Sequence, residues 1–356
     1  MNHRFQPNCL PTLIGSLPLN NHNEAVRLVF EYTPDIPIWA QLPVFPAEGM
    51  VQQFLPGMPG LTTENEKVFI HTAAETFDDS LLGFYEDFMA VTDGEKPLSD
   101  SRFALQPDTA GGFFALTDYL EKTSVPTTAV KGQVTGPFTF CTGISDQNGR
   151  AIFYDPQLRD VGVKLLAQKA RWQVQQLSRY GGPPIIFFDE PGLAGFGSSE
   201  FISVSPEDIK ACFEEVFGAV HSAGGLAGVH VCANTDWSMV LDSSADIVNF
   251  DAYAYFDRFL LYAERIQNFI ASGKILALGI VPTLNREDIE KENVDSLENV
   301  LAEKIDTIAA LGIDRQKILS QTLITPSCGA GSLSIALMKK VLEMTRDVSE
   351  RFRSEL

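Results

Sequence analysis

The sequence has no stretch of eighteen consecutive apolar residues, the length that a membrane-spanning helix needs. Its first residues, MNHRFQPNCLPT, have no apolar run after the basic residue and therefore do not predict a signal peptide. Basic residues are also scarce: the sequence has 27 Lys and Arg against 46 Asp and Glu, which gives a formal net charge of −19. This acidity argues against nucleic acid and anionic membranes as partners, but it is compatible with a small neutral substrate or a basic protein partner.

Disulfide bonds are not expected either. The chain has only five cysteines, an odd number, and they are scattered over positions 9, 141, 212, 232 and 328. This spacing is not that of a disulfide framework. In a reducing cytoplasm, a spaced set of His and Cys serves a metal or catalysis more often than a crosslink. We therefore expect a cytoplasmic protein with free thiols.

Short apolar runs bounded by turn residues alternate with helical patterns along the 356 residues. The runs that predict strands lie at 9–16, 36–43, 127–136, 183–192, 225–232, 245–252, 274–283 and 318–327. Their nearly continuous apolar character is typical of parallel strands that are covered on both faces. Eight strand–helix repeats predict an α/β protein with a (β/α)8 TIM barrel, and an open doubly wound sheet is the alternative.

One predicted connection is far longer than the others. It runs from about residue 44 to residue 124, between the second and third predicted strands. Long insertions in barrels usually lie over one mouth, where they contribute to a binding site. We therefore predict a single barrel domain over 1–356 with a cap-like insertion at 44–124.

Chemically versatile residues end several of the predicted strands, where the reactive groups of a barrel gather. His230 and Cys232 end the fifth strand and, being two residues apart, share one face of it. Cys328 follows the eighth strand. The other strand-end residues of this kind are Ser16, Asp189, Glu190 and Asp251.

His230, Cys232 and Cys328 form the set that Zn²⁺ prefers: imidazole nitrogen and thiolates, with an oxygen or an open position as the fourth ligand. The alternative is that they belong to the core, since cysteine is among the most buried residue types and is often inert. A third thiol at a separate strand end favours the metal site. Zinc lowers the pKa of a bound thiol and holds it ready for alkylation, so such a site suits thiol activation.

The stretch FDEPG has two interpretations. Asp189 and Glu190 can act as an acid–base pair, or Asp189 can bind an ammonium group while Glu190 braces the turn before Pro191. The strand end at Gly15 and Ser16, rich in backbone N–H groups, can hold a carboxylate.

Five segments taken together resemble the catalytic barrel of cobalamin-independent methionine synthase, in the superfamily that includes uroporphyrinogen decarboxylase. They occur in family order over nearly the whole chain and read LIGSLP, VTGPF, FDEPGLAG, HVC and PSCG. The specific part is HVC with a distant CG. The resemblance implies a zinc-dependent methyltransferase that methylates a thiol, with homocysteine as the acceptor and methionine as the product.

The resemblance also implies roles for individual residues. His230, Cys232 and Cys328 match the zinc ligands, and Asp251 stands where the family has a fourth, glutamate ligand. The segment Ile14, Gly15 and Ser16 matches the part that holds the homocysteine carboxylate. Asp189 matches the residue that binds its ammonium group. A second acidic residue has no clean match, and Gln41 is the nearest candidate for its place.

The methyl donor follows from a departure in length. Full-size members carry a second barrel that helps to bind folate, and this chain has the length of one barrel. It resembles the short, core-type members, which implies methylcobamide on a corrinoid protein as the donor. The alternatives are a coenzyme M-type or other thiol methyltransferase and a non-catalytic zinc- or corrinoid-binding protein. A uroporphyrinogen decarboxylase-like enzyme is disfavoured because the first two strand ends contain no Arg or Lys.

Overall fold

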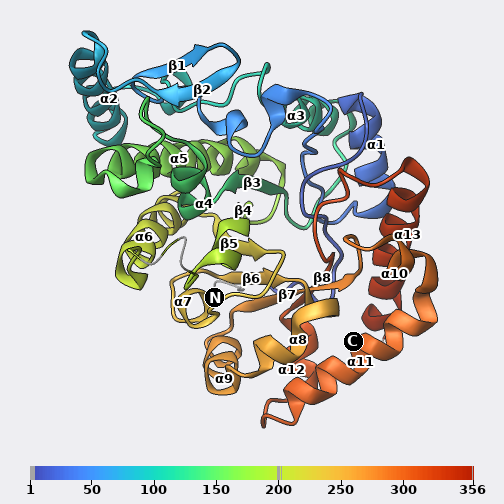
Figure 1. The fold of residues 1–356 in the computed structure, drawn as a ribbon. Coiled ribbons are helices and arrows are strands. Elements are labelled where there is room, and N and C mark those ends of the chain that lie inside the picture. Colours follow the sequence, from blue (N-terminus) through green and yellow to red (C-terminus); the bar gives the residue numbers. More distant parts are fainter. Residues whose placement is uncertain (1–4, 199–200, 202, 355) are drawn as a thin grey trace.

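The computed structural model describes residues 5–198, 201, 203–354 and 356, so the start of the predicted domain, 1–4, lies outside the described part. Six parallel strands form one sheet in chain order, surrounded by helices (Figure 1). They are β3 (Lys131–Thr135), β4 (Ile185–Asp189), β5 (Leu226–Val231), β6 (Ile247–Phe250), β7 (Ile275–Val281) and β8 (Thr322–Pro326). They fall within the last six predicted strands and are almost wholly buried, as strands between helices must be.

Two irregular segments close the ring between β8 and β3. They pair with each other and with the two edge strands through three isolated bridges, Pro11–Ile324, Ser16–Gln41 and Ile38–Lys131. The first two predicted strands, 9–16 and 36–43, therefore occupy strand positions without being regular strands. Prolines at positions 11, 37 and 43 explain this, because they have no N–H to give to a ladder. The predicted (β/α)8 barrel is confirmed.

The helices that follow the strands cover the outside of the barrel. They are α4 (Pro137–Gly143), α5 (Pro156–Leu177), α6 (Pro206–Ser222), α7 (Ser238–Leu241), α8 (Ala252–Leu260), α9 (Ala263–Ala271), α10 (Arg286–Lys291), α11 (Val294–Ala309), α12 (Arg315–Ser320) and α13 (Ile335–Arg353). Local sequence sets their starts. In α6, the Ser205 side chain accepts a hydrogen bond from Asp208 N at 3.0 Å, and Pro206 fills the first helical position.

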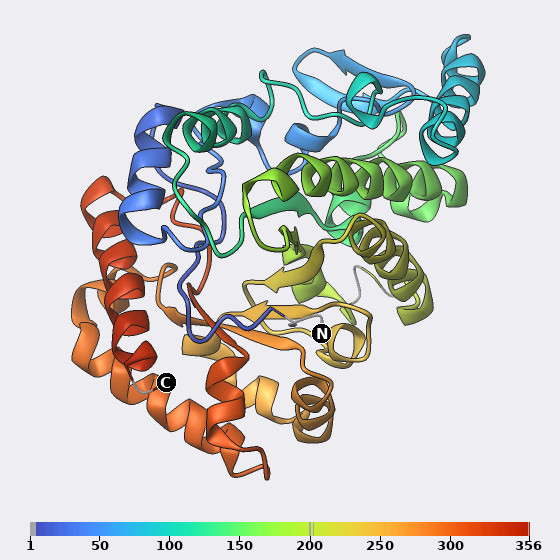
Figure 2. The ribbon, with the colours of Figure 1, turned by 180° about the vertical axis from the view of Figure 1, so that it is seen from behind.

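The long connection contains α3 (Gly111–Thr123), α2 (Phe77–Thr92) and an antiparallel hairpin of β1 (Leu61–Glu64) and β2 (Lys67–Ile70). The hairpin and α2 lie beside α5 at one edge of the barrel (Figures 1 and 2). One link is the Tyr85 hydroxyl, which donates to the Asp160 carboxylate at 2.9 Å. Of this connection, the short stretch Glu48–Met50 lines the central cavity.

The barrel interior is apolar at one end and polar at the other. Its apolar layer is formed by Leu10, Ile36, Ala129, Ile185, Phe187, Ile247, Ile275, Ala277 and Leu323. The polar residues that follow these positions along the strands therefore gather at the carboxyl ends, above this buried apolar layer. Within the described residues, no helix is long and apolar enough to cross a membrane.

Candidate metal centre and adjoining cavity

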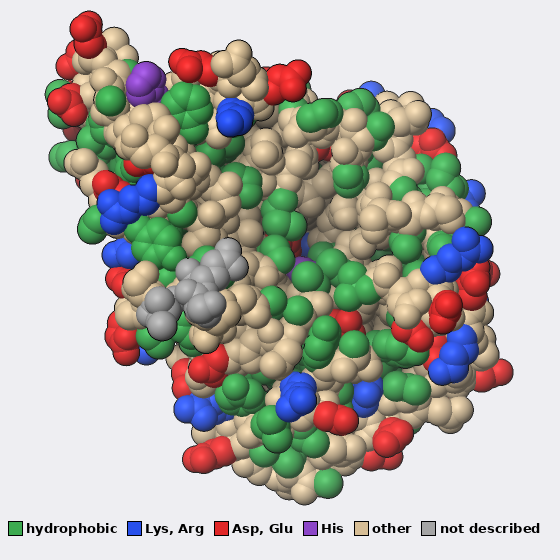
Figure 3. All heavy atoms as spheres, viewed as in Figure 1, with side chains coloured by type: hydrophobic (Ala, Val, Ile, Leu, Met, Phe, Trp, Pro, Cys, Tyr) green, Lys and Arg blue, Asp and Glu red, His purple; other side chains and the backbone are tan. Residues whose placement is uncertain are grey.

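A cavity of about 410 Å³ lies at the carboxyl ends of the strands. In the space-filling view, hydrophobic side chains gather around a central hollow and charged side chains lie mostly at the periphery (Figure 3). The lining combines the strand-end residues with the two irregular segments: Ile14, Gly15, Ser16, Gln41, Pro43, Glu48, Gly49, Met50, Asp189, Pro191, His230, Cys232, Cys328, Gly329, Gly331 and Ser332. The cavity is thus lined by every predicted site residue except Glu190 and Asp251.

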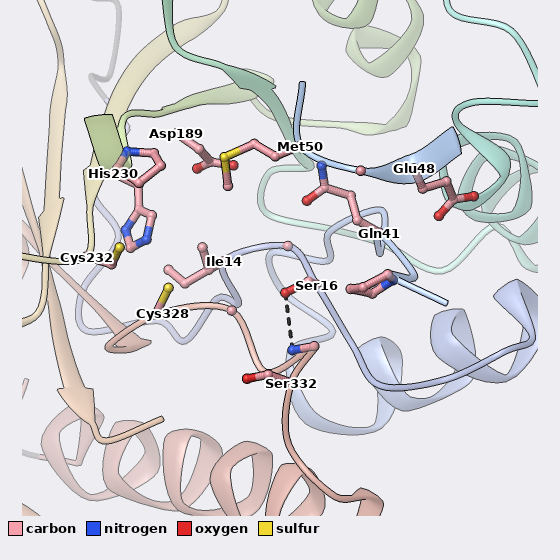
Figure 4. Close-up of a pocket in the computed structure, with 16 residues that line it drawn as sticks. Ile14, Ser16, Gln41, Glu48, Met50, Asp189, His230, Cys232, Cys328 and Ser332 are labelled. Atoms are coloured by element: carbon pink, nitrogen blue, oxygen red, sulfur yellow. Dashed lines mark hydrogen bonds between the residues drawn. The ribbon is translucent and has the colours of Figure 1, made fainter. Parts of the chain in front are cut away.

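His230, Cys232 and Cys328 meet at one end of this cavity. His230 is the second-to-last residue of β5, Cys232 comes directly after this strand, and Cys328 lies two residues beyond β8. One ligand atom from each of the three lies within 4.8 Å of the others. Figure 4 shows both sulfur atoms on the same side of the cavity as the imidazole ring. Two strand ends that are distant in sequence therefore bring a nitrogen and two sulfurs together.

Asn249 determines which nitrogen of His230 is available. Its Nδ2 donates to Ala277 O and to Thr325 Oγ1, both at 2.8 Å, so its Oδ1 must face the imidazole. Oδ1 can only accept, and it is hydrogen-bonded to His230 Nδ1, which places the imidazole proton on Nδ1. Nε2 is left with a lone pair, is buried, and has no hydrogen-bond partner among the described residues.

The surroundings of the two thiols favour a thiolate at Cys232 and a protonated thiol at Cys328. The Cys328 thiol donates to Cys232 and His230 lies beside it, which together lower the pKa of Cys232. The same hydrogen bond and burial raise the pKa of Cys328. A buried unpartnered nitrogen beside a thiolate and a second thiol is the donor set of a zinc site, so these residues fit the ion.

Asp251, the predicted fourth ligand, is not part of this group. It follows β6 and caps α8, where its Oδ1 accepts a hydrogen bond from Ala254 N at 2.8 Å. Burial raises the pKa of Asp251 to about 6. The shorter side chain caps the helix through Oδ1, and its ligation of a metal ion stays a prediction.

Asp189 and Glu190 have different surroundings. Glu190 accepts hydrogen bonds from Phe138 N at 2.9 Å and from Thr139 N and Oγ1 at 2.8 and 2.6 Å, so it braces the start of α4. Asp189 faces the cavity, and its Oδ1 is buried without a partner among the described residues. Burial raises the pKa of Asp189 to about 6, against the opposing effects of His230 and Lys131. This carboxylate is an acceptor in need of a donor.

Gln41 presents a second acceptor. Gln53 Nε2 donates to Thr109 O at 2.7 Å, which turns Gln53 Oε1 toward Gln41 Nε2 at 2.6 Å. The amide of Gln41 is therefore oriented with Oε1 next to Gly15, where a Cβ would lie only 2.6 Å from that oxygen. Gln41 and Ser16 lie on the side of the cavity away from Cys232 (Figure 4).

The backbone around Ser16 is held against the loop after β8. Gly331 N donates to Ser16 Oγ at 3.2 Å, and Ala330 N donates to Ser16 O at 3.0 Å. A Cβ at Gly329 would lie 2.3 Å from Ser16 Oγ, so only glycine allows this approach. The segment Ile14–Ser16 is thereby fixed as one wall of the cavity.

Asn249, Glu48 and Met50 are among the residues of the site that sequence reasoning missed. Asn249 precedes Asp251 by two positions, so it shares the inward face of β6 and pairs in register with His230. The two-residue repeat of side-chain direction along a strand was the signal that could have identified Asn249. Glu48 and Met50 lie in an irregular stretch that carries no periodic signal. The Glu48 carboxylate is turned away, because it accepts from Leu42 N at 2.8 Å and is hydrogen-bonded to His22 Nε2 at 2.6 Å.

Comparison with known proteins adds information on the fold. No family model and no curated protein matches the chain. A B12-independent methionine synthase from Shewanella sp. W3-18-1, in complex with selenomethionine, matches over 98% of this chain and 98% of its own at 18% identity, with a TM-score of 0.56. A pneumococcal exo-β-D-N-acetylglucosaminidase module covers 96% of this chain and 85% of its own at 10% identity and a TM-score of 0.49. At 18% identity, the likeness to the methionine synthase concerns the fold alone.

Proposed function

We propose that this chain is a zinc-dependent methyltransferase that methylates a thiol, with homocysteine as the acceptor and methionine as the product. One observation carries the proposal. The His230, Cys232 and Cys328 group lies at one end of a cavity whose walls also hold Asp189, an acceptor without a donor. A ligand with a thiol at one end and an ammonium group at the other would satisfy both.

Zinc bound by these three residues would lower the pKa of the acceptor thiol and keep its thiolate nucleophilic. The protein itself supplies orientation. Asp189 Oδ1 and Gln41 Oε1 accept hydrogen bonds from the acceptor's ammonium group, and the Ile14–Ser16 segment receives its carboxylate. Fixing both ends of the acceptor places the sulfur for in-line attack, and such orientation can supply several kcal/mol of the barrier reduction.

The transfer step balances with a methylated corrinoid as the donor. The acceptor sulfur would attack the methyl carbon and form the S–C bond, while the donor's cobalt–carbon bond would break and its electron pair would stay with the departing corrinoid. The thiol proton passes to solvent. The apolar side chain of Met50, which lines the cavity and is 44% exposed, supports the docking of a protein carrier.

A methyl-transfer assay tests this function. Zinc-loaded protein is mixed with methylcobalamin and, in separate reactions, with homocysteine, coenzyme M or 2-mercaptoethanol. We expect methionine from homocysteine, together with the absorbance of the demethylated corrinoid, and little product from the other two thiols. A preference for coenzyme M would assign the alternative acceptor. Zinc binding without methylation of any thiol would leave a non-catalytic binding protein.

A further inference from the structure

Lys131 carries a charged group into the interior of the barrel. It lies on β3, its side chain is 0% exposed, and its Nζ lies 4.4 Å from the centroid of the Phe187 ring. Its ammonium group donates a hydrogen bond to Ile14 O. Burying an ammonium costs several kcal/mol, so packing alone would favour an apolar residue here.

The hydrogen bond connects Lys131 directly to the cavity wall. Ile14 O and Gly15 N–H belong to one trans peptide group, so they point in opposite directions. A charged donor on the carbonyl polarises this peptide and strengthens its N–H as a donor. Ile14, Gly15 and Ser16 all line the cavity. The positive charge of Lys131 is therefore bonded directly to the segment that forms this wall of the cavity.

Asp189 provides the matching negative charge. Asp189 and Lys131 influence each other electrostatically, and Asp189 faces the same cavity from the end of β4. Glu190, which follows it, is already engaged by the start of α4. The cavity thus has a positive charge hydrogen-bonded to its Ile14–Ser16 wall and a negative charge on Asp189, a polarity that matches an α-amino acid zwitterion.

We propose that Lys131 is a positioning residue for the carboxylate of the acceptor, acting through the Ile14–Gly15 peptide and through its charge. This inference rests on the proposed function, because it takes the acceptor to be an amino acid thiol. It assigns to Lys131 the selection of acceptors that carry a carboxylate, and it leaves the attachment of sulfur to the three-residue metal centre.

Binding of three different thiols distinguishes a role of Lys131 in carboxylate recognition from a role in packing. Homocysteine carries a carboxylate and an amine, 4-sulfanylbutanoate carries only the carboxylate, and 3-sulfanylpropan-1-amine carries only the amine. Their binding to zinc-loaded protein is measured by calorimetry, with the zinc content of each sample determined in parallel. If wild-type protein binds zinc but not homocysteine, the proposed function fails before Lys131 is tested.

In Lys131→Met we expect the affinity for the two carboxylate thiols to fall by about tenfold or more, because a charge-assisted hydrogen bond is lost. The affinity for the amine thiol should change by less than about threefold. Unchanged affinity for homocysteine would refute the proposal. Equal losses for all three thiols would also refute it, since they would indicate disturbed packing.

Lys131→Gln is the second variant. It keeps an N–H donor for Ile14 O but removes the charge. Because Ile14 O keeps a hydrogen-bond partner, this variant is expected to fold even if Lys131→Met does not. We expect the same carboxylate-selective loss. Wild-type affinity for homocysteine in Lys131→Gln would show that the charge plays no part, and the proposal would fail.

Discussion

Replacing Asn249 with leucine tests how the metal centre is organised. Leucine has nearly the shape of asparagine, so the barrel interior stays filled while the polar contacts disappear. His230 Nδ1 then loses its acceptor, and the amide no longer holds the proton on that nitrogen. The imidazole is free to carry its proton on Nε2, where it competes with a metal ion.

The expected loss follows from these contacts. A buried N–H left without an acceptor costs about 1–3 kcal/mol, which corresponds to roughly a tenfold to hundredfold weaker zinc affinity. Removal of a hydrogen-bond partner behind a ligating histidine typically has an effect of this size. Thr325→Val is the matched control. It removes one acceptor of Asn249 Nδ2, but Ala277 O still holds the amide in place.

Zinc affinity is measured by competition with a chromophoric chelator under reducing conditions, so that the cysteines remain thiols. We expect a loss of at least about tenfold in Asn249→Leu and of less than about threefold in Thr325→Val. Wild-type affinity in Asn249→Leu would refute the role of Asn249 in fixing the imidazole. Equal losses in both variants would point to a general loosening of the barrel interior.

Three further predictions concern the centre and the fold. Cys328→Ala should lose bound zinc and methyl transfer, whereas Cys212→Ala, which alters a buried thiol on α6, should keep both. Burial lowers the pKa of Lys169 to about 7, so wild-type stability in urea should rise as the pH is raised through 7, because the unfolded chain then binds the proton more tightly. Lys169→Met should reduce this rise, leaving the part that Lys131 contributes at higher pH, and should add about 2–4 kcal/mol near pH 7; an unchanged pH profile would contradict the reasoning. Gly136→Ala should destabilise the fold by more than about 2 kcal/mol, because its Cβ would lie 2.2 Å from the Glu190 side chain. Gly218→Ala is the control: it has open space on α6 and should stabilise the fold by about 1 kcal/mol. If both variants changed the free energy of unfolding in the same direction, this explanation would be excluded.

The fold was predictable because eight apolar runs alternate with helical patterns, and parallel strands must be covered on both faces. The irregularity of the first two strand positions was less accessible. Prolines at 11, 37 and 43 were visible, but the pairing that replaces a regular ladder depends on β8 and β3, which are distant in sequence. The placement of the hairpin and α2 beside α5 depends on tertiary contacts such as that of Tyr85 with Asp160, which have no local signal.

The meeting of His230, Cys232 and Cys328 was predictable from the barrel rule, since the carboxyl ends of the strands surround one mouth. The role of Asp251 was not. A carboxylate at a strand end can face a metal or cap the next helix, and the sequence pattern is the same in both cases. The backbone geometry shows that Asp251 caps α8, a role that the sequence pattern alone could not reveal.

The direction of hydrogen bonding at both ends of the cavity is set in the same way. An amide side chain is held by a main-chain carbonyl, and this fixes which of its two ends faces the site. Ala277 O holds Asn249, so that its oxygen meets His230 and leaves Nε2 with a lone pair. Thr109 O holds Gln53, so that Gln41 turns its own oxygen toward Gly15.

Neither amide touches the bond that would be made, yet each sets whether a neighbouring atom accepts or donates. An aspartate or a glutamate at these positions could not reproduce this direction, because a carboxylate has no N–H to give to the carbonyl that orients it. The carbonyls come from β7 and from the long insertion. The polarity of the site is therefore a property of the assembled barrel, and the motifs that end its strands cannot specify it alone.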